Sequence, residues 1–254
     1  MTQKPCILAV ETSSRIGSVA IAFGDKVLAE KSFSGPMRHS VEIFPAIDKL
    51  LDSFSRKPNQ IEQIYISVGP GSFTGVRIAT TLAKAMHLAN AAKIIAVDTL
   101  DVIAANVINL TIEKTDWASS HESQHTSQET IATVLDAKRG QFFIAIYKRD
   151  TSEEIWKKLL TDSLMTASQF LDQFSCKEEP IRLLGDGLMY YKDKFKADGV
   201  SFFDEKHWSP RAKKVHLLGW KMSSVGQFAD PLTLTPNYLR RPQAEVKSIP
   251  HKNT

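Results

Sequence analysis

The sequence predicts an α/β protein whose two domains begin in the same way. Its 254 residues are enough for one large or two small domains. β-rich runs open the chain, and alternating helical and strand patterns follow them, as expected of sheets flanked by helices. A later segment, "IATVLDAKRGQFFIAIYKR", repeats the layout of the opening "ILAVETSSRIGSVAIAF": a strand, an acidic residue, a polar turn with Gly and a second strand. Glu11 and Gly17 correspond to Asp136 and Gly140, and this self-similarity indicates a duplicated fold.

The first domain, assigned to residues 1–108, opens with three strands. Runs at 6–11 and 18–23 flank a polar turn, and "KVLAEKSF" supplies the third strand of an antiparallel meander. Apolar residues then repeat every three or four positions, which predicts a helix with Ser40 as N-cap and a kink at Pro45. A strand in "IEQIYISVG", a helix to about Ala91 and a strand in "KIIAVD" follow, and the last of these suits a parallel sheet.

Residues 109–130 are polar and rich in Ser, Thr and Gln, which predicts a linker or exposed excursion. His121 and His125 lie four residues apart within it, but no carboxylate or thiolate framework accompanies them, so we interpret them as part of a solvated loop. The second domain is assigned to residues 131–240. Its helix over 209–224, which starts at the cap pair Ser209 and Pro210, is expected to pack back on the first domain, and 241–254 is expected to be a tail.

Composition and charge fit an ordinary soluble globular protein. The hydrophobic fraction is 43% and the charged fraction 24%. A net charge of +4 suits occasional contact with RNA but not a dedicated nucleic-acid stripe. Cys6 and Cys176 lack the spacing of metal ligands, so we expect neither a disulfide framework nor a zinc cluster. No apolar run approaches the roughly 20 residues that span a bilayer, so we expect a cytoplasmic protein with no membrane contact.

The glycine-rich stretch "VGPGSFTGVRIA", residues 68–79, resembles a phosphate loop only in part. It lacks the Lys of a Walker loop, and it follows an antiparallel opening rather than the first strand of a dinucleotide-binding unit. We therefore expect Gly69 and Gly71 to supply unusual backbone angles, Thr74 to cap the helix and Gly75 to allow close packing. Arg77 is the residue that this interpretation does not explain.

Several blocks together resemble the bacterial TsaB family, also called YeaZ. They are the opening meander, "HSVEIFPAIDKLL", "VGPGSFTGVRIA", "IAVDTLDVIA", "LDAKRGQFF" and "PNYLRR". The resemblance implies two actin-like (ASKHA) domains, each a mixed sheet flanked by helices. It also implies a role in making N6-threonylcarbamoyladenosine (t6A) at position 37 of tRNA, as the non-catalytic companion of the related subunit TsaD, with the ATPase TsaE joining them.

The metal ligands of the catalytic relative are missing from this chain. TsaD carries V-N-H-x-E-G-H, in which two imidazoles one helical turn apart can hold a metal. In the matching stretch "VDTLDVI", Thr99 and Ile103 stand where the histidines would be, and Ile has no donor atom. The resemblance therefore implies an accessory subunit that is not an enzyme by itself, and a metallopeptidase has the least support.

A nucleotide site of its own is only partly represented. In ASKHA kinases two hairpins clamp phosphates, and Thr12, Ser13 and Ser14 fit the first hairpin, while Gly185 and Gly187 resemble an adenosine-side turn. The second hairpin presents Lys and Arg with no hydroxyl group. We expect at most weak binding of nucleotide, with ATP used by the complex. An ASKHA phosphotransferase that acts alone is the alternative.

Function without catalysis must reside in surfaces, and two helix faces are the candidates. From helical periodicity we expect two outward strips, which the resemblance implies contact TsaD, or a second copy when the chain is alone, while tRNA is reached through the complex. The strips are Arg77, Thr80, Thr81, Lys84 and Leu88 on the second helix, and His39, Glu42, Ala46 and Lys49 on the first.

Overall fold

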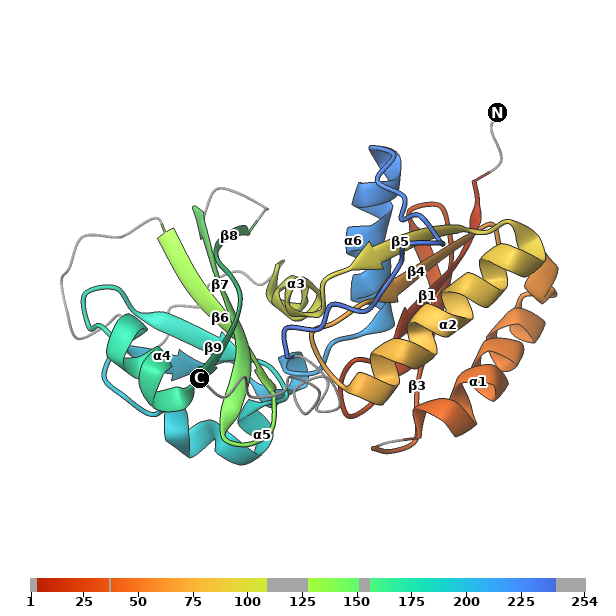
Figure 1. Cartoon of the computed structure of the whole chain (residues 1–254). Coiled ribbons are helices and arrows are strands. Elements are labelled where there is room, and N and C mark those ends of the chain that lie inside the picture. The colour runs from red at the N-terminus through yellow and green to blue at the C-terminus, as the bar shows by residue number, and fades with distance from the viewer. Residues whose placement is uncertain (1–3, 37, 109–127, 151–155, 241–254) are drawn as a thin grey trace, which may run out of the picture.

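Two five-stranded sheets with the same strand order organise the chain. The computed structural model describes residues 4–36, 38–108, 128–150 and 156–240. The first sheet has the order β3-β2-β1-β4-β5, and the second, read from β8, has the order β8-β7-β6-β9-β10 (Figure 1). In both sheets the first three strands are antiparallel and the last two pair in parallel. This shared topology confirms the duplicated, mixed α/β plan.

The elements of the N-terminal half are β1 (Cys6–Glu11), β2 (Ser18–Phe23), β3 (Lys26–Ser32), α1 (His39–Ser53), β4 (Gln63–Ser67), α2 (Phe73–Asn90), β5 (Lys93–Val97) and α3 (Thr99–Ala104). Those of the remainder are β6 (Gln128–Asp136), β7 (Gln141–Asp150), β8 (Lys157–Thr166), α4 (Ala167–Phe174), β9 (Ile181–Leu184), α5 (Leu188–Tyr191), β10 (Val200–Phe202) and α6 (Ala212–Ser224). Short 3₁₀ turns begin at Pro58, Ala105, Lys192 and Glu205.

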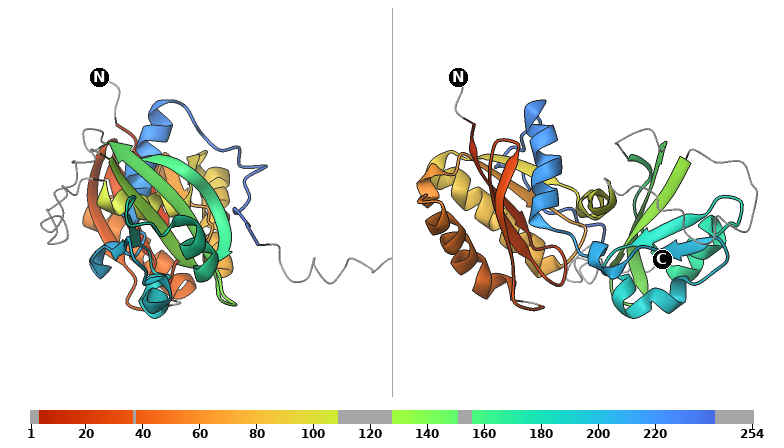
Figure 2. Two further views of the ribbon diagram at one scale, coloured as in Figure 1. Left: turned by 90° about the vertical axis from the view of Figure 1, so that its left-hand side faces the viewer. Right: turned by 180° about the vertical axis from the view of Figure 1, so that it is seen from behind.

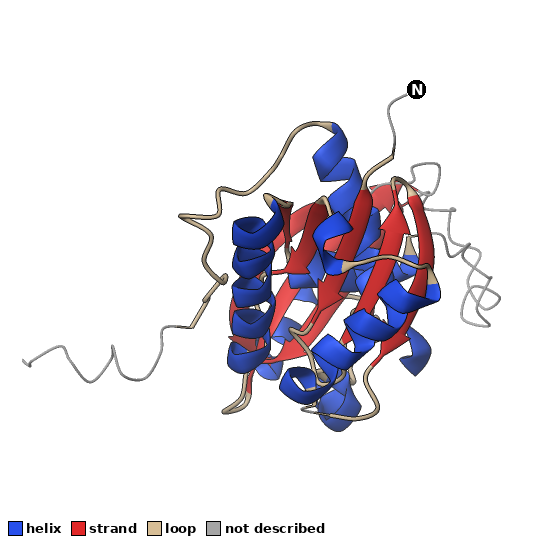
Figure 3. Ribbon diagram, turned by 90° about the vertical axis from the view of Figure 1, so that its right-hand side faces the viewer, coloured by secondary structure: helices blue, strands red, loops and turns tan. Residues whose placement is uncertain are grey.

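The first sheet is buried on both faces, which explains why β1 is apolar at every position before Glu11. Leu8 and Val10 point into the core beneath α1 and α2, whereas Ile7 and Ala9 pack with α6. Figure 3 shows α1 and α2 side by side in front of the sheet, and the right-hand view of Figure 2 shows α6 on the opposite face. Helix α6 thus completes the core of the first sheet, far along the chain from its strands.

Three predicted helix starts are wrong. α1 begins at His39, with Arg38 as N-cap and no side-chain cap, and it continues through Pro45. α2 is capped by Ser72, whose Oγ accepts from Gly75 N, rather than by Thr74. α6 begins at Ala212 instead of at Ser209 and Pro210, because partners distant in sequence, described below, satisfy its first N–H groups.

The second sheet has its own core, in which the rings of Phe142, Phe170 and Phe195 meet edge to face. α3 lies between the sheets and contacts both β6 and α6.

The expected excursion lies outside the described residues over 109–127, as do His121 and His125, and β6 already begins at Gln128. The expected tail also lies outside them. Within the described ranges, no helix combines the length and the apolar character that crossing a bilayer requires.

Candidate functional site

The glycine loop before α2 brings the first hairpin turn against the start of that helix. Gly69 has a φ of +110°, as expected of a glycine, but Gly71 and Gly75 do not have positive φ. These two are required by space, because a Cβ on Gly71 would lie 2.3 Å from the Ser13 carbonyl oxygen and one on Gly75 would lie 1.7 Å from that of Thr12. The expected unusual angle at Gly71 is therefore wrong, and its role is close packing.

The hydroxyl groups of the first hairpin turn are engaged within the protein. Thr12 Oγ1 donates to Gly75 O at 2.7 Å, and Ser13 donates through N and Oγ to Glu11 Oε1 at 2.6 and 2.5 Å. Ser67 Oγ donates to the other oxygen of Glu11. Glu11 is fully buried, and this burial raises the pKa of its carboxyl although the serine hydrogen bonds oppose the shift. Ser14 Oγ contacts Ile16 O at 3.4 Å.

The other predicted nucleotide residues lie at the junction of the two domains. The backbone at Gly185 and Gly187 runs so close to β6 that a Cβ on either would lie within 3 Å of main-chain atoms. Between them, Asp186 accepts from Arg15 N at 3.3 Å, and burial raises its pKa to about 6. The structure therefore brings Thr12–Ser14 and Gly185–Gly187 to the same junction, mostly through internal contacts, and nucleotide binding stays a prediction.

A second cluster joins the domains at α3. Lys158 Nζ of β8 lies 2.7 Å from Asp101 Oδ1, 2.7 Å from Asp162 Oδ1 and 3.6 Å from Asp98 Oδ2. Tyr147 of β7 donates its hydroxyl to Asp101 Oδ1 at 2.7 Å. The residues come from both domains, so only the fold brings them together and the sequence analysis did not find them.

Asp98 has the most altered acidity in this cluster. Burial, together with a hydrogen bond and charge repulsion from Asp162, raises its pKa to about 8. Asp162 Oδ2 has no other donor among the described residues, so a proton held by Asp98 satisfies both carboxyls. Burial alone would lower the pKa of Lys158, but the surrounding carboxylates outweigh it and raise that pKa. Thr99 and Ile103 are fully buried on α3 beside this cluster.

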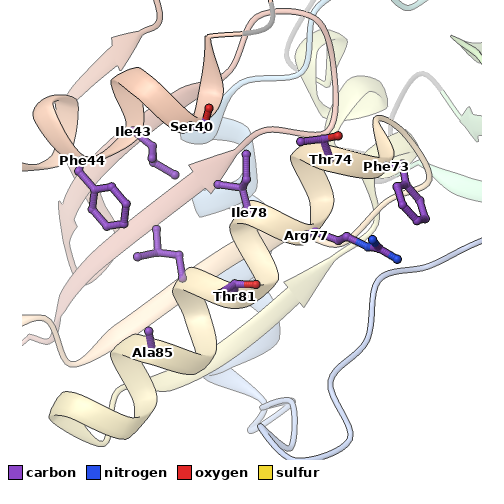
Figure 4. A pocket seen from close by; sticks show the side chains of 10 residues that line it. Ser40, Ile43, Phe44, Phe73, Thr74, Arg77, Ile78, Thr81 and Ala85 are labelled. Carbon is purple, nitrogen blue, oxygen red and sulfur yellow. The ribbon is translucent and has the colours of Figure 1, made fainter.

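An apolar groove lies between α1 and α2. Its volume is about 530 Å³, and Ile43, Ile78 and Leu82 are among the side chains that line it (Figure 4). Phe44 stands at its α1 edge with 60% of its surface exposed. Ser40, Phe73, Thr74, Arg77, Thr81 and Ala85 complete the lining.

The groove contains only part of the predicted partner surface. Arg77 and Thr81 line it, Leu88 is exposed further along α2, and Glu42, Lys49 and Lys84 are at least partly exposed. Three residues predicted to point outward do not. His39, Ala46 and Thr80 are 3%, 1% and 6% exposed.

The buried residues have clear internal roles. His39 Nε2 donates to Ser14 O at 3.0 Å, Thr80 Oγ1 donates to Val76 O at 2.8 Å, and Ala46 packs in the core under α1. The prediction missed Phe44, which it counted in the apolar repeat of the first helix, and Ile78, which it assigned to neither face of the second. The sequence pattern that could have located the groove is a second stripe on α2. It consists of Thr74, Ile78, Thr81 and Ala85, spaced by four, three and four residues.

Comparisons with known proteins match most of the chain. The model of the family described as "TsaD: tRNA N6-adenosine threonylcarbamoyltransferase" matches residues 27–162. The "tRNA threonylcarbamoyladenosine biosynthesis protein TsaB" of Bacillus subtilis (strain 168) is 29% identical over 96% of this chain and 97% of its own length. The protein of the same name from Escherichia coli (strain K12) is 25% identical over 97% of this chain and 99% of its own length.

A solved structure shares the fold. "YeaZ from Pseudomonas aeruginosa" superposes with a TM-score of 0.72 at 19% identity, covering 92% of this chain and 100% of that one. A second structure is that of an uncharacterized protein with similarity to peptidase YEAZ from the same organism. It superposes with a TM-score of 0.74 at 20% identity, covering 93% of this chain and 100% of that one. The predicted class of duplicated actin-like domains is confirmed by this likeness together with the strand order of the two sheets.

Proposed function

The chain belongs to the family that the matching model describes, TsaD: tRNA N6-adenosine threonylcarbamoyltransferase, and from this premise we propose that it is a non-catalytic subunit of the machinery that makes t6A in tRNA. Its curated relatives are named TsaB, as the sequence blocks predicted. The proposed role is to bind a TsaD-type catalytic subunit and help to recruit the TsaE ATPase. The observation that carries the proposal is the exposed apolar groove between α1 and α2.

The absence of a catalytic role is proposed from side-chain chemistry. Thr99 and Ile103 stand where the resemblance places the metal-binding histidines of TsaD, and Ile103 offers no donor atom. The polar cluster beside them is held together by the ammonium group of Lys158. Catalysis would then belong to the TsaD-type subunit, ATP would be used by the complex, and this chain would need no cofactor of its own.

The groove suits a helix of the TsaD-type subunit. It is a trough between α1 and α2, and the small residues Thr81 and Ala85 along α2 let a third helix approach closely (Figure 4). Phe44, Phe73 and Leu88 add exposed apolar surface to the same two helices, and such a concentration of apolar side chains marks an interaction site. tRNA would be reached through the assembled complex.

Placing a charge in the groove tests the proposal. We expect Ala85→Glu to weaken binding of the TsaD-type subunit of the same organism about tenfold or more, since a central interface position is typically worth 1–3 kcal/mol. Ala197→Glu, the same change at an exposed position of the second domain, is the matched control. Isothermal titration calorimetry measures the affinity, and t6A formation by the reconstituted components measures the function. Undiminished binding and t6A formation with Ala85→Glu, or t6A formation by this chain alone, would overturn it.

A further inference from the structure

Two sequence segments far apart in the chain meet at the start of α2: "SFTGVR", residues 72–77, and "PNYLR", residues 236–240. Arg77 Nε donates to the hydroxyl of Tyr238 at 2.8 Å. The Arg77 guanidinium lies 3.6 Å from the centroid of the Phe73 ring, and the Phe73 and Tyr238 rings are 5.2 Å apart. Arg77 is part of the groove lining, and in Figure 4 its guanidinium points to the flank of α2 away from α1, at the margin of the groove.

The Arg77 guanidinium is held in place but keeps free hydrogen-bonding capacity. Stacking on Phe73 and the bond from Nε restrict its orientation, whereas Nη1 and Nη2 make no hydrogen bond with the described residues. Across the described part of the chain, no carboxylate forms an ion pair with it. An arginine fixed in this way presents two parallel donors that match a carboxylate, at little further cost in entropy.

The rest of α2 has the same sign of charge. The helix contains no Asp or Glu, and its second cation, Lys84, follows Arg77 by seven residues, which is about 10 Å along the helix. Lys84 also has no ion pair with the described residues. The exposed side of α2 is therefore a basic edge that runs beside an apolar groove.

We propose that this edge selects a partner segment that carries carboxylates beside its apolar side chains, with Arg77 as the specificity-determining cation and Lys84 as a second contact. The inference rests on the proposed function, because the occupant is the docking helix of the TsaD-type subunit. The helix places its apolar face in the groove, and its acidic residues reach across α2. Charge complementarity of this kind fixes register and partner choice. The continuity of the edge with an apolar groove favours a protein occupant over an RNA phosphate backbone.

The test compares affinities for the TsaD-type subunit at NaCl concentrations from low to high. Arg77→Met keeps a chain that can stack on Phe73 but removes the charge, and we expect it to weaken binding about tenfold at low salt and to flatten the salt dependence. Tyr238→Phe removes only the hydroxyl that orients Arg77, so we expect a smaller loss. Lys221→Met, a cation on the distant α6, is the control and should bind as the unmodified protein does.

The outcomes separate this inference from the proposed function. If the unmodified chain does not bind the TsaD-type subunit, both fail. If Ala85→Glu abolishes binding while Arg77→Met keeps the original affinity and salt slope, the groove stands and the role of Arg77 is overturned. If Arg77→Met instead weakens only the binding of tRNA to the assembled complex, the edge serves RNA and the inference is also overturned. Thermal unfolding of each variant confirms that it is folded.

Discussion

At the scale of single residues, the most informative group is the carboxyl of Asp98. It caps α3 by accepting from Leu100 N at 2.8 Å, and it also faces Asp101, Asp162, Lys158 and, through Asp101, Tyr147. Its pKa is about 8 in the folded protein, against an ordinary value of 3.8. Between these two pH values the folded state retains a proton that the unfolded state has released. The contribution of Asp98 to stability is therefore complete below about pH 4 and is lost as the pH rises toward 8.

Replacing Asp98 by Asn tests whether this carboxyl makes the protein less stable as the pH rises. The amide oxygen can still cap α3, and the amide NH₂ can donate to Asp162 as the protonated carboxyl does. We expect the free energy of unfolding to fall from pH 5 to pH 8 in the unmodified protein, and to fall less in Asp98→Asn. Urea unfolding at four pH values measures it, with the exposed Asp48→Asn as control. Parallel pH profiles for Asp98→Asn and the unmodified protein would contradict the assignment.

At the scale of elements, the start of α6 shows why local sequence rules misplaced a helix. Ala212 N donates to Ser18 Oγ at 2.9 Å, and Lys213 N donates to Glu30 Oε1 at 3.0 Å. These caps lie more than 180 residues away in the sequence, so no local pattern could reveal them. Ser209 lies before the actual N-cap, Arg211, and its carbonyl accepts from Asn106 Nδ2 at 2.9 Å.

The cap at Ser18 should hold the first turn of α6 on the sheet. Ser18→Ala leaves the buried N–H of Ala212 without an acceptor, and we expect it to lower the free energy of unfolding by about 1–2 kcal/mol. Trypsin should also cleave faster at Lys213 and Lys214, next to the loosened turn. Ser224→Ala removes an exposed serine hydroxyl at the other end of α6 and should leave both measurements nearly unchanged. If Ser18→Ala is as stable as the unmodified protein and is cleaved at the same rate, packing alone positions the helix.

Strands were predicted more accurately than the outward faces of helices. The runs at 6–11 and 18–23 match β1 and β2 because alternating and fully apolar patterns identify strands locally. Helical periodicity assigns one buried stripe, but α1 is bordered by the sheet, by the first hairpin turn at His39 and by α2. His39 and Ala46 are consequently buried, and Phe44, one of the apolar residues that repeat along α1, is exposed at the groove.

At the scale of the whole molecule, segments distant in sequence join the two domains. The segment after α6 returns along the first sheet, where Ala229 N donates to Ile94 O at 2.8 Å and Asn237 N donates to Val68 O at 2.7 Å. Arg240 then reaches the second hairpin and donates to Ala137 O at 2.7 Å. Duplication was predictable because each copy repeats its strand pattern. These connections between the domains could not be predicted from the sequence, because they depend on how the two copies are positioned relative to each other in the folded protein.

No element of the described residues covers the faces of α1 and α2 on the side away from the second domain (Figure 1). The resemblance implied that isolated members pair with themselves through these helices, and the TsaD-type subunit is proposed to use the same groove. Both partners cannot occupy about 530 Å³ of groove at once. Self-association and binding of the TsaD-type subunit should therefore compete.

We expect the isolated chain to form a two-fold symmetric dimer that becomes a one-to-one complex as the TsaD-type subunit is added. Ala85→Glu should be monomeric, because a two-fold symmetric contact contains both copies of the groove and therefore two introduced carboxylates. Ala197→Glu should dimerise normally. Sedimentation velocity across a range of protein concentrations resolves the three species. A stable assembly in which two copies remain paired while each binds a TsaD-type subunit would show that the two contacts use different surfaces, because a shared groove permits one occupant at a time.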